Sequence, residues 1–296
     1  MIMLMNDYLI YLILALLGLC MGSFAGATVW RIRARQLIED KEAGDEVDLK
    51  EYKKLLPLTK ANFAKDRSRC LSCGHELSWF DLLPLVSWLG TFGRCRYCKA
   101  SIGKFEPLIE IGTALFFILS FAFWPDSLST TMQISIFILW LMSGVLLAML
   151  FAYDLKWFLL PNWLIFPLIV LGACIAVLNI LSAQDIMQAL LSLVSAVMIL
   201  SGLYLALWLM SKGQWIGFGD VKLGLALALL LGDWRLAFIA LFAANLVGCI
   251  IVIPSLLIGK MTRSTHVPFG PLLITGAILA MLFGQSVIEW YTNSLI

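Results

Sequence analysis

Two aspartates stand out in a chain that is otherwise strongly apolar. Asp154 comes at the end of a long hydrophobic run, and Asp220 begins another, directly after Gly217-Phe218-Gly219. A carboxylate at membrane depth costs roughly 2.5–3.5 kcal/mol at a helix centre, so such a residue faces protein or water rather than lipid. If both aspartates lie at the same face of a membrane, their carboxylates can act as a pair.

A pair of carboxylates is suited to the hydrolysis of a peptide bond. One must be ionised to take a proton from water, and the other must be protonated to donate to the carbonyl oxygen. Two like charges about 3 Å apart do not both ionise, so Asp154 and Asp220 would titrate as a unit. The sequence leaves open which of the two is the base.

Three further residues of the second motif are predicted to support this site. Without Cβ atoms, Gly217 and Gly219 would let the backbone beside Asp220 approach an extended substrate closely or adopt a positive φ. Lys222 is placed in the same active-site loop, where its charge would act on a carboxylate or on the substrate. The alternative for Lys222 is that it extends to the lipid headgroups, as basic residues at helix ends commonly do.

A second constellation consists of cysteines in two CxxC pairs that are separated by twenty-one residues: Cys70, Cys73, Cys95 and Cys98. Each pair offers two thiolates from one tight turn, which is what a structural tetrahedral zinc site needs. Four thiolates fill such a site, so neither His75 nor Asp81 is needed as a ligand. A disulfide framework is the rival interpretation, and a reducing cytosol would disfavour it.

The composition sets the elements that must position these groups. With 61% hydrophobic residues, 14% charged residues and a mean hydropathy of +0.93, the chain is predicted to be an all-α polytopic membrane protein. A span needs about 20 apolar residues. Eight segments are candidates, of which the sixth is short: 8–30, 107–124, 131–153, 162–180, 186–210, 220–232, 235–258 and 268–290.

The basic residues predict the orientation, because they concentrate on the cytosolic side of a membrane. Residues 31–106 hold fifteen of the 21 Lys and Arg residues. Five more fall in loops on the same side, and only Arg235 falls on the other; the five are Lys156, Lys212, Lys222, Lys260 and Arg263. Both termini are therefore expected outside, with both aspartates at the cytosolic face. Topology explains these charges, so they predict no nucleic-acid partner.

The predicted organisation has three parts. Residues 1–30 form the first transmembrane helix. Residues 31–106 form a cytosolic loop, with a charged insertion at 34–66 and the four-cysteine site at 70–98. Residues 107–296 form a seven-helix membrane domain that carries both aspartates. The insertion is predicted to be a short amphipathic helix or a flexible segment whose mixed charge marks a solvated face.

The ordered set of motifs resembles the bacterial type IV prepilin peptidases, which are GxGD-type membrane aspartyl proteases. The resemblance covers nearly the whole chain, and its motifs are Gly22-Ser23-Phe24, the two CxxC pairs, Pro107-Leu108-Ile109-Glu110, Asp154 through Leu160-Pro161-Asn162, Gly217 through Leu223, and Pro268-Phe269-Gly270-Pro271.

The resemblance implies that the chain cuts the basic leader from type IV prepilins, or from pseudopilins of type II secretion, at the cytosolic face of the bacterial plasma membrane. Many members also methylate the new N-terminal amine with S-adenosylmethionine. The chain departs from the family's usual residues at Gly26, where asparagine is common, and at Glu106, where an aromatic residue is common.

The binding site for a methyl donor is not identified by the sequence. Glu110 is a candidate for holding the donor or a substrate amine, and its alternative is an ordinary carboxylate at a helix end. Three rival functions stay open: a peptidase without methyl transfer, a proton-coupled transporter, and a scaffold that uses the zinc loop. Transporter carboxylates lie near the midplane between pseudo-symmetric halves, whereas both aspartates here are predicted at one edge. A scaffold would need neither aspartate.

Overall fold

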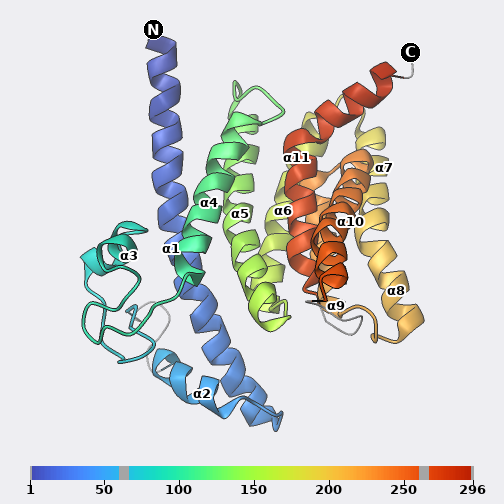
Figure 1. The fold of residues 1–296 in the computed structure, drawn as a ribbon. Helices are drawn as coiled ribbons and strands as arrows, with labels where there is room; N and C mark the ends of the chain where they lie inside the picture. Colours follow the sequence, from blue (N-terminus) through green and yellow to red (C-terminus); the bar gives the residue numbers. More distant parts are fainter. Residues whose placement is uncertain (1, 60–66, 260–266, 295–296) are drawn as a thin grey trace. The chain divides into compact units, whose positions relative to one another are not determined.

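The computed structural model describes residues 2–59, 67–259 and 267–294, with side chains from Tyr8 onward (Figure 1). Across these ranges the regular structure is helical, apart from two isolated β-bridges. The chain divides into two compact units, Met1–Ile118 and Leu119–Ile296. Within the described part of the chain, seven helices are long and apolar enough to cross a membrane, which confirms the prediction of an all-α polytopic membrane protein.

The first unit is built on two long helices and an irregular loop between them. Its elements are α1 (Ile2–Ala43), α2 (Leu49–Leu55), η1 (Leu56–Thr59), η2 (Trp79–Leu82), α3 (Val86–Gly90) and α4 (Phe105–Ala122), of which α4 continues into the second unit. The loop between η1 and α4 holds the cysteines and the short elements η2 and α3.

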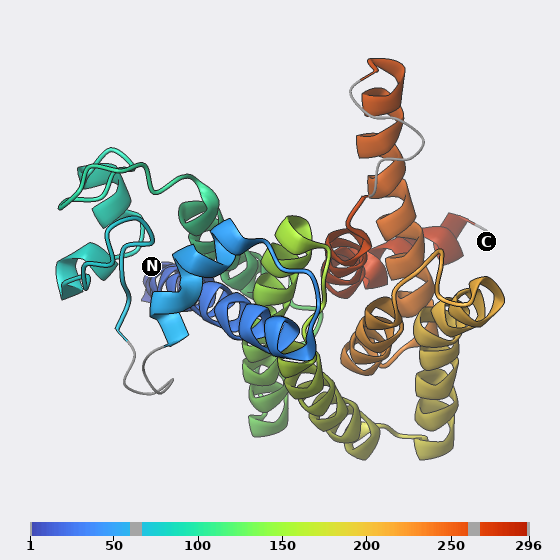
Figure 2. The same cartoon turned by 90° about the horizontal axis from the view of Figure 1, so that it is seen from below.

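Helix α1 does not end with its apolar segment but continues as a charged helix to Ala43. Helix α2 lies beside this extension (Figures 1 and 2). Four buried side chains form the contact, namely Ala34, Leu37, Leu55 and Leu58. Much of the charged insertion is therefore an ordered helical pair with a small apolar core. Its residues 60–66 lie outside the described part of the chain, as do Lys260 and Arg263.

Glycines bring the backbones of α1 and α4 into direct contact. A Cβ atom on Gly18 would lie 2.6 Å from Cα of Ala114, and one on Gly22 would lie 2.5 Å from Cα of Glu110. Small residues four positions apart allow such close packing of membrane helices. The Gly-Ser-Phe motif therefore holds Glu110 against α1.

The second unit is a bundle of helices. Its elements are α5 (Thr131–Trp157), α6 (Asn162–Ser182), α7 (Ile186–Val197), η3 (Met198–Gly202), α8 (Leu203–Ser211), α9 (Phe218–Leu231), α10 (Trp234–Leu257) and α11 (Phe269–Ser294). The segment η3 is one π-helical turn, and it joins α7 and α8 into a single span of residues Ile186–Ser211.

Helix α9 corresponds to the short sixth segment of the sequence prediction. It has 14 residues, which gives a length of about 21 Å, whereas the hydrocarbon core of a bilayer is about 30 Å thick. It packs against α6, α7, α8, η3 and α11, and most of its side chains after Lys222 are buried. Because protein surrounds α9, it does not need the length of a helix that faces lipid.

Candidate active site and metal centre

Asp154 lies in the last turn of α5 and is buried, with 5% of its surface exposed. Helix α5 ends at Trp157 because Phe158 adopts the left-handed conformation, with its N–H bonded to the carbonyl of Asp154. The backbone N–H of Gly270, at the start of α11, donates a hydrogen bond of 3.0 Å to Oδ2 of Asp154. Two helices that are distant in sequence therefore hold this carboxylate.

Asp220 lies in the first turn of α9, partly buried. Its own N–H donates to the carbonyl of Gly217 at 3.1 Å, and the backbone N–H of Gly217 lies within reach of its carboxylate. The charge of Asp154 acts on Asp220, so the structure brings the two carboxylates into one electrostatic site. Each of them has a glycine N–H as a neighbour.

The glycines near the two aspartates leave room for the side chain of Leu160. Neither Gly217 nor Gly219 has a positive φ. A Cβ atom on Gly219 would lie 3.0 Å from Cβ of Leu160, and one on Gly270 would lie 3.4 Å from Cδ2 of the same leucine. Leu160, in the turn between α5 and α6, thus packs against both glycines. The close approach that Gly219 permits is made to Leu160.

Gly270 is the site residue that sequence reasoning did not assign, although the Pro268–Pro271 stretch was noted as a motif. A Cβ atom at this position would lie 2.7 Å from Oδ2 of Asp154, a distance that real Cβ atoms essentially never show. A glycine between two prolines at the start of a helix was the available signal. It could not show which carboxylate the glycine faces.

Lys222 has contacts of its own. Its amine donates a hydrogen bond of 2.8 Å to Oδ1 of Asn162, and it lies over the ring of Phe218, 5.1 Å from the centroid. This bond ties the start of α9 to the start of α6. Lys222 therefore helps to position the helix that carries Asp220.

The four cysteines come together in the first unit. Their sulfur atoms all lie within 4.8 Å of one another, and the sulfurs of Cys70 and Cys98 are 3.9 Å apart. Tetrahedral coordination at about 2.3 Å places sulfurs about 3.8 Å apart. All four are free thiols. The donor set and its spacing fit a metal ion such as zinc.

The two pairs are built in the same way. The N–H of Gly74 donates to the carbonyl of Cys70, and the N–H of Lys99 donates to the carbonyl of Cys95, each at 2.9 Å. Gly74 and Lys99 both adopt the left-handed conformation, with φ of 72° and 60°. Each CxxC pair is thus a tight turn that points two thiols to one side.

The cluster favours thiolates unequally. Partial burial would raise the pKa of the Cys70 thiol, but hydrogen bonds from the backbone N–H groups of Cys73 and Ser72 lower that pKa to about 7. The backbone N–H of Ala100 would lower the pKa of Cys98, yet burial and the neighbouring thiols raise it to about 11. Four thiolates this close repel one another, and a bound cation would offset that repulsion.

Among the described residues, the group of side chains that could hold a metal ion consists of the four cysteines, and His75 and Asp81 make other contacts. Asp81 accepts hydrogen bonds from Arg96 at 2.9 Å and from the hydroxyl of Tyr97 at 3.1 Å. The ring of His75 packs on Tyr97, with centroids 3.7 Å apart. These contacts connect the first cysteine turn to the second and support the loop.

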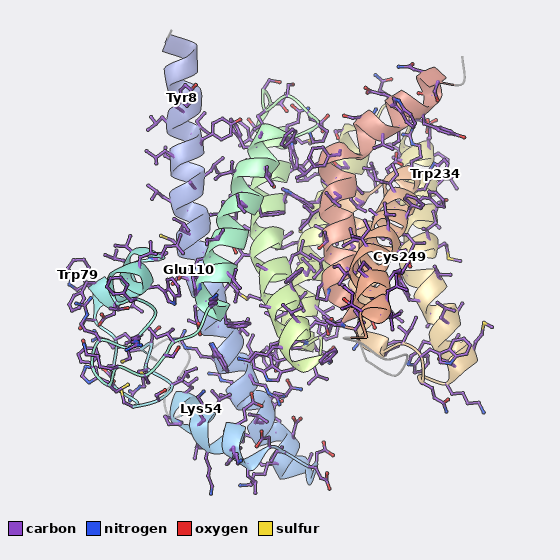
Figure 3. The ribbon with its side chains drawn as sticks, viewed as in Figure 1. Tyr8, Lys54, Trp79, Glu110, Trp234 and Cys249 are labelled. Carbon is purple, nitrogen blue, oxygen red and sulfur yellow. The ribbon has the colours of Figure 1, made fainter. Side chains whose placement is uncertain are left out.

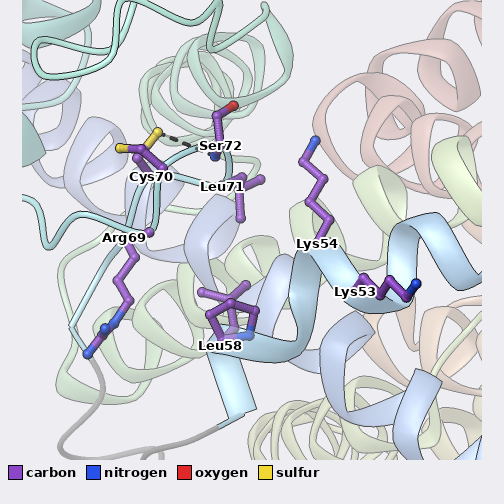
Figure 4. A pocket seen from close by; sticks show the side chains of 10 residues that line it. Lys53, Lys54, Leu58, Arg69, Cys70, Leu71 and Ser72 are labelled. Atoms are coloured by element: carbon purple, nitrogen blue, oxygen red, sulfur yellow. Dashed lines mark hydrogen bonds between the residues drawn. The ribbon is translucent and has the colours of Figure 1, made fainter.

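A pocket of about 250 Å³ lies beside the cysteine cluster (Figure 4). Lys53, Lys54, Arg69 and Cys70 are among its lining residues, which all belong to the first unit. The pocket contains neither aspartate, so it has no part in the two-carboxylate site.

Glu110 is buried at the contact of α4 with α1 (Figure 3), with 6% of its surface exposed. Its carboxylate accepts a hydrogen bond of 2.8 Å from the backbone N–H of Leu85, and Ser23 also bonds to it. Leu85 has a φ of 56°, so Glu110 stabilises a strained turn of the loop. This geometry supplies a structural reason for a buried carboxylate here.

The two departures from the usual family residues face each other. A Cβ atom on Gly26 would lie 3.9 Å from Cγ of Glu106, and the indole N–H of Trp30 donates a hydrogen bond of 3.0 Å to Glu106. The two positions at which the chain departs from the usual family residues are therefore neighbours in the structure.

Comparisons with known proteins agree with this division into two units. The model for the bacterial peptidase A24 N-terminal domain matches residues 16–124, and the model for the type IV leader peptidase family matches residues 140–253. No solved structure matches the chain.

Curated relatives extend over more of the sequence. The chain is similar to prepilin leader peptidase/N-methyltransferases from Aeromonas salmonicida (strain A449), with 33% identity over 79% of this chain and 77% of that protein. It is 30% identical to the protein of the same name from Aeromonas hydrophila, over 98% of this chain and 96% of that protein. It is also 30% identical to the one from Pseudomonas aeruginosa, over 93% of this chain and 91% of that protein. The chain therefore belongs to the type IV leader peptidase family.

Proposed function

We propose that Asp154 and Asp220 are the catalytic pair with which this protein, an aspartic-type leader peptidase of the membrane, removes the leader peptide from type IV prepilins or pseudopilins. The observation that carries the proposal is the convergence of two carboxylates from α5 and α9 in one electrostatic site. Each is held beside a glycine N–H.

The chemistry follows from the pairing. One carboxylate takes a proton from water as the water oxygen adds to the scissile carbonyl carbon, and the other donates its proton to the carbonyl oxygen. The first then returns a proton to the leaving amine as the C–N bond breaks. The Gly270 N–H orients Asp154 through one oxygen and leaves the other oxygen for the reaction.

The substrate is inferred from the relatives, which are named prepilin leader peptidases. The distribution of Lys and Arg supports a site at the cytosolic face of the bacterial inner membrane, with both termini outside. Because Asp154 ends one helix and Asp220 begins another, cleavage would take place at the edge of the bilayer.

For the cysteine cluster we propose structural zinc, held by Cys70, Cys73, Cys95 and Cys98. A site with four protein thiolates is closed and offers no position for a reacting water, so the metal would hold the loop together. The proposal is supported by the spacing of the sulfurs.

We further propose that the protein methylates the amine that cleavage exposes, with S-adenosylmethionine as donor. The support is the second half of the relatives' name, N-methyltransferase. Glu110 is kept as a candidate for the donor site, although its bond to Leu85 explains its burial without a ligand. A peptidase that lacks methyl transfer is the alternative.

The decisive experiment uses purified Asp154→Asn and Asp220→Asn proteins with a prepilin-like peptide that carries a basic leader and a hydrophobic helix. Mass spectrometry of the products should show that each substitution lowers cleavage by roughly four orders of magnitude. An Asp185→Asn protein is the matched control. Asp185 caps α7 by accepting from the N–H of Gln188, and asparagine caps helices equally well.

Substantial cleavage by either Asp154→Asn or Asp220→Asn would contradict the assignment. Equal loss in the Asp185→Asn control would indicate that the assay responds to any change in the bundle rather than to the pair.

A further inference from the structure

Tyr204 is a buried polar residue for which the proposed mechanism has no use so far. It lies in the first turn of α8 and has 3% of its surface exposed. Its hydroxyl oxygen has no hydrogen-bond partner among the described groups. A buried hydroxyl without a partner is unfavourable, so its presence at this position calls for a reason.

The position of Tyr204 links it to both halves of the aspartate pair. The charge of Asp220 acts on its hydroxyl. Its ring packs edge-to-face on the ring of Phe269, with centroids 5.2 Å apart. Phe269 precedes Gly270, whose N–H is bonded to Asp154. Tyr204 therefore packs on the residue that precedes the N–H bonded to Asp154, and the charge of Asp220 acts on its hydroxyl.

The backbone just before Tyr204 is held unusually close to α9. In η3 the N–H of Leu203 bonds to the carbonyl of Met198, which makes a π-turn. The hydroxyl of Ser201 donates to the carbonyl of Val221 at 3.0 Å. A Cβ atom on Gly224 would lie 2.5 Å from the carbonyl oxygen of Leu200, so only glycine fits there.

This close contact holds the turn that precedes Tyr204 against α9, next to the residue that follows Asp220. Single π-turns inside helices are frequent at functional sites. Here the π-turn inserts one residue between the helical turns of α7 and α8. The bond from Ser201 to Val221 then ties this turn to α9 one residue after Asp220. The fold thus positions the tyrosine by three separate features: the π-turn, the Ser201 bond and Gly224.

Tyr204 also makes the pair asymmetric. Asp154 and Asp220 each have a glycine N–H as a neighbour. The charge of Asp220 acts on the hydroxyl of Tyr204, and Asp154 is not among the groups that act on it. The other charged group of the α9 N-terminus, Lys222, has its amine bonded to Asn162.

We propose, on the basis of the function proposed above, that Tyr204 is a positioning residue whose hydroxyl donates a hydrogen bond to the carboxylate of Asp220 during the reaction. Hydrogen bonds in active sites often tighten only when substrate is bound, so the bond would form as the site closes on the peptide. A donated hydrogen bond favours the ionised carboxylate.

This assigns the roles that the sequence left open. Asp220 is the ionised base, which takes the proton of water as the water oxygen bonds to the carbonyl carbon. Asp154 is the acid, whose proton moves to the carbonyl oxygen. When the C–N bond breaks, the amine leaves with the proton from Asp220, the tetrahedral hydroxyl returns its proton to Asp154, and the pair is restored.

The test is a Tyr204→Phe substitution in the full-length protein, which removes one oxygen and keeps the ring that packs on Phe269. With a prepilin-like peptide we expect kcat to fall by about 10- to 100-fold, because a hydrogen bond to a charged group is lost. KM should stay unchanged, since the bond serves the reaction rather than ground-state binding. The matched control is Tyr291→Phe on α11, where the side chain is 58% exposed, and it should leave kcat unchanged.

Thermal unfolding of the same proteins separates positioning from folding. The inference holds if kcat falls while the unfolding temperature of the Tyr204→Phe protein is equal to or higher than that of the unaltered protein, as removal of a buried hydroxyl without a partner allows. It is overturned if kcat changes by less than twofold, if KM rises in place of a fall in kcat, or if lost activity merely tracks lost folded protein. Retained cleavage in the Asp154→Asn or Asp220→Asn protein would instead overturn the proposed function itself.

Discussion

The two units of the protein position their chemical groups in opposite ways. In the first unit, each pair of cysteine thiols is set by one turn of a few residues, closed by the N–H of Gly74 or Lys99. In the second unit, Asp154 is held by Gly270, which is far away in the sequence, and the helix that carries Asp220 is tied to α6 by the bond from Lys222 to Asn162. The cysteine site is thus a local structure, whereas the aspartate site is a product of helix packing.

This difference has a thermodynamic consequence. The cysteine thiols lie on two short turns, and a metal ion bound to all four thiols would supply the energy that joins these turns. The carboxylates are held by helices whose glycines allow backbone contact, so the order of the site depends on the whole bundle. The two family models match one unit each, but α11, which carries Gly270, lies beyond the residues matched by the second model.

The strongest test of the packing-dependent site is Gly270→Ala. The added methyl group would lie 2.7 Å from Oδ2 of Asp154, and it must displace the carboxylate or the start of α11. A displacement of about 1 Å at a catalytic group costs on the order of 100-fold in rate. We expect cleavage to fall by that factor while zinc content stays the same. Peptide cleavage and elemental analysis of one preparation measure both.

The same substitution at Gly112 is the control, because α4 leaves open space at that position. A Gly112→Ala protein should cleave normally. If Gly270→Ala retained full activity, the contact between α11 and Asp154 would not be needed for catalysis.

The local site is tested by Cys73→Ser. A hydroxyl is a poor replacement for a thiolate ligand, so bound zinc should fall from about one equivalent to less than about half. Because the ligands belong to the first unit, we expect cleavage to fall far less than it does with Asp154→Asn. Elemental analysis and the peptide assay provide the two readings.

Cys174→Ser, which removes a thiol from α6, is the matched control and should keep its zinc. Loss of all cleavage together with zinc would show that the aspartate site depends on the metal-bound loop, and the contrast between the units would fail.

The contrast also explains what could be predicted from the sequence. Hydropathy located the seven helices of the described residues that are long and apolar enough to cross a membrane, and the CxxC spacing identified four cysteines that the structure clusters. Both signals are local. The extension of α1 to Ala43 was not foreseen, because an ordered charged helix depends on its contact with α2. The sixth segment was predicted to be short, but its burial among neighbouring helices depends on packing.

The residues that support the aspartate site were the hardest to predict from the sequence. A tyrosine in an apolar segment carries no signal of its own, and the significance of Tyr204 appears only when η3 and α9 are seen in contact. The bond between Lys222 and Asn162 joins helices separated by 60 positions. Residue types predicted which groups could react, and packing decided which groups assist them.

A smaller effect is expected for Gly74→Ala in the first cysteine turn. Gly74 has a φ of 72° and no atom within 4 Å of an added Cβ, so the effect is purely conformational. The left-handed conformation costs a residue with Cβ roughly 1–2 kcal/mol, which corresponds to about a 5- to 30-fold loss of zinc affinity. Competition with a chelator measures this loss.

The turn of the second cysteine pair shows that the loss of zinc affinity should be small. Lys99, a residue with a Cβ atom, adopts a φ of 60° there, and the turn still forms. Gly90→Ala, at a position with open space and no positive φ, is the control and should bind zinc normally. A Gly74→Ala protein with unchanged affinity would show that metal binding does not depend on this turn.

The smallest effect is predicted for methyl transfer in the Asp154→Asn protein. Methyl transfer needs only a deprotonated amine aligned with a sulfonium donor, and proton cycling between Asp154 and Asp220 contributes nothing to that step. We therefore expect this variant to methylate a pre-cleaved pilin at the rate of the unaltered protein, measured as label transferred from S-adenosylmethionine. Incorporation by the unaltered protein alone would mean that the two reactions share the aspartate. If neither protein incorporated label, the protein would be a peptidase only, and the proposed methyl transfer would be wrong.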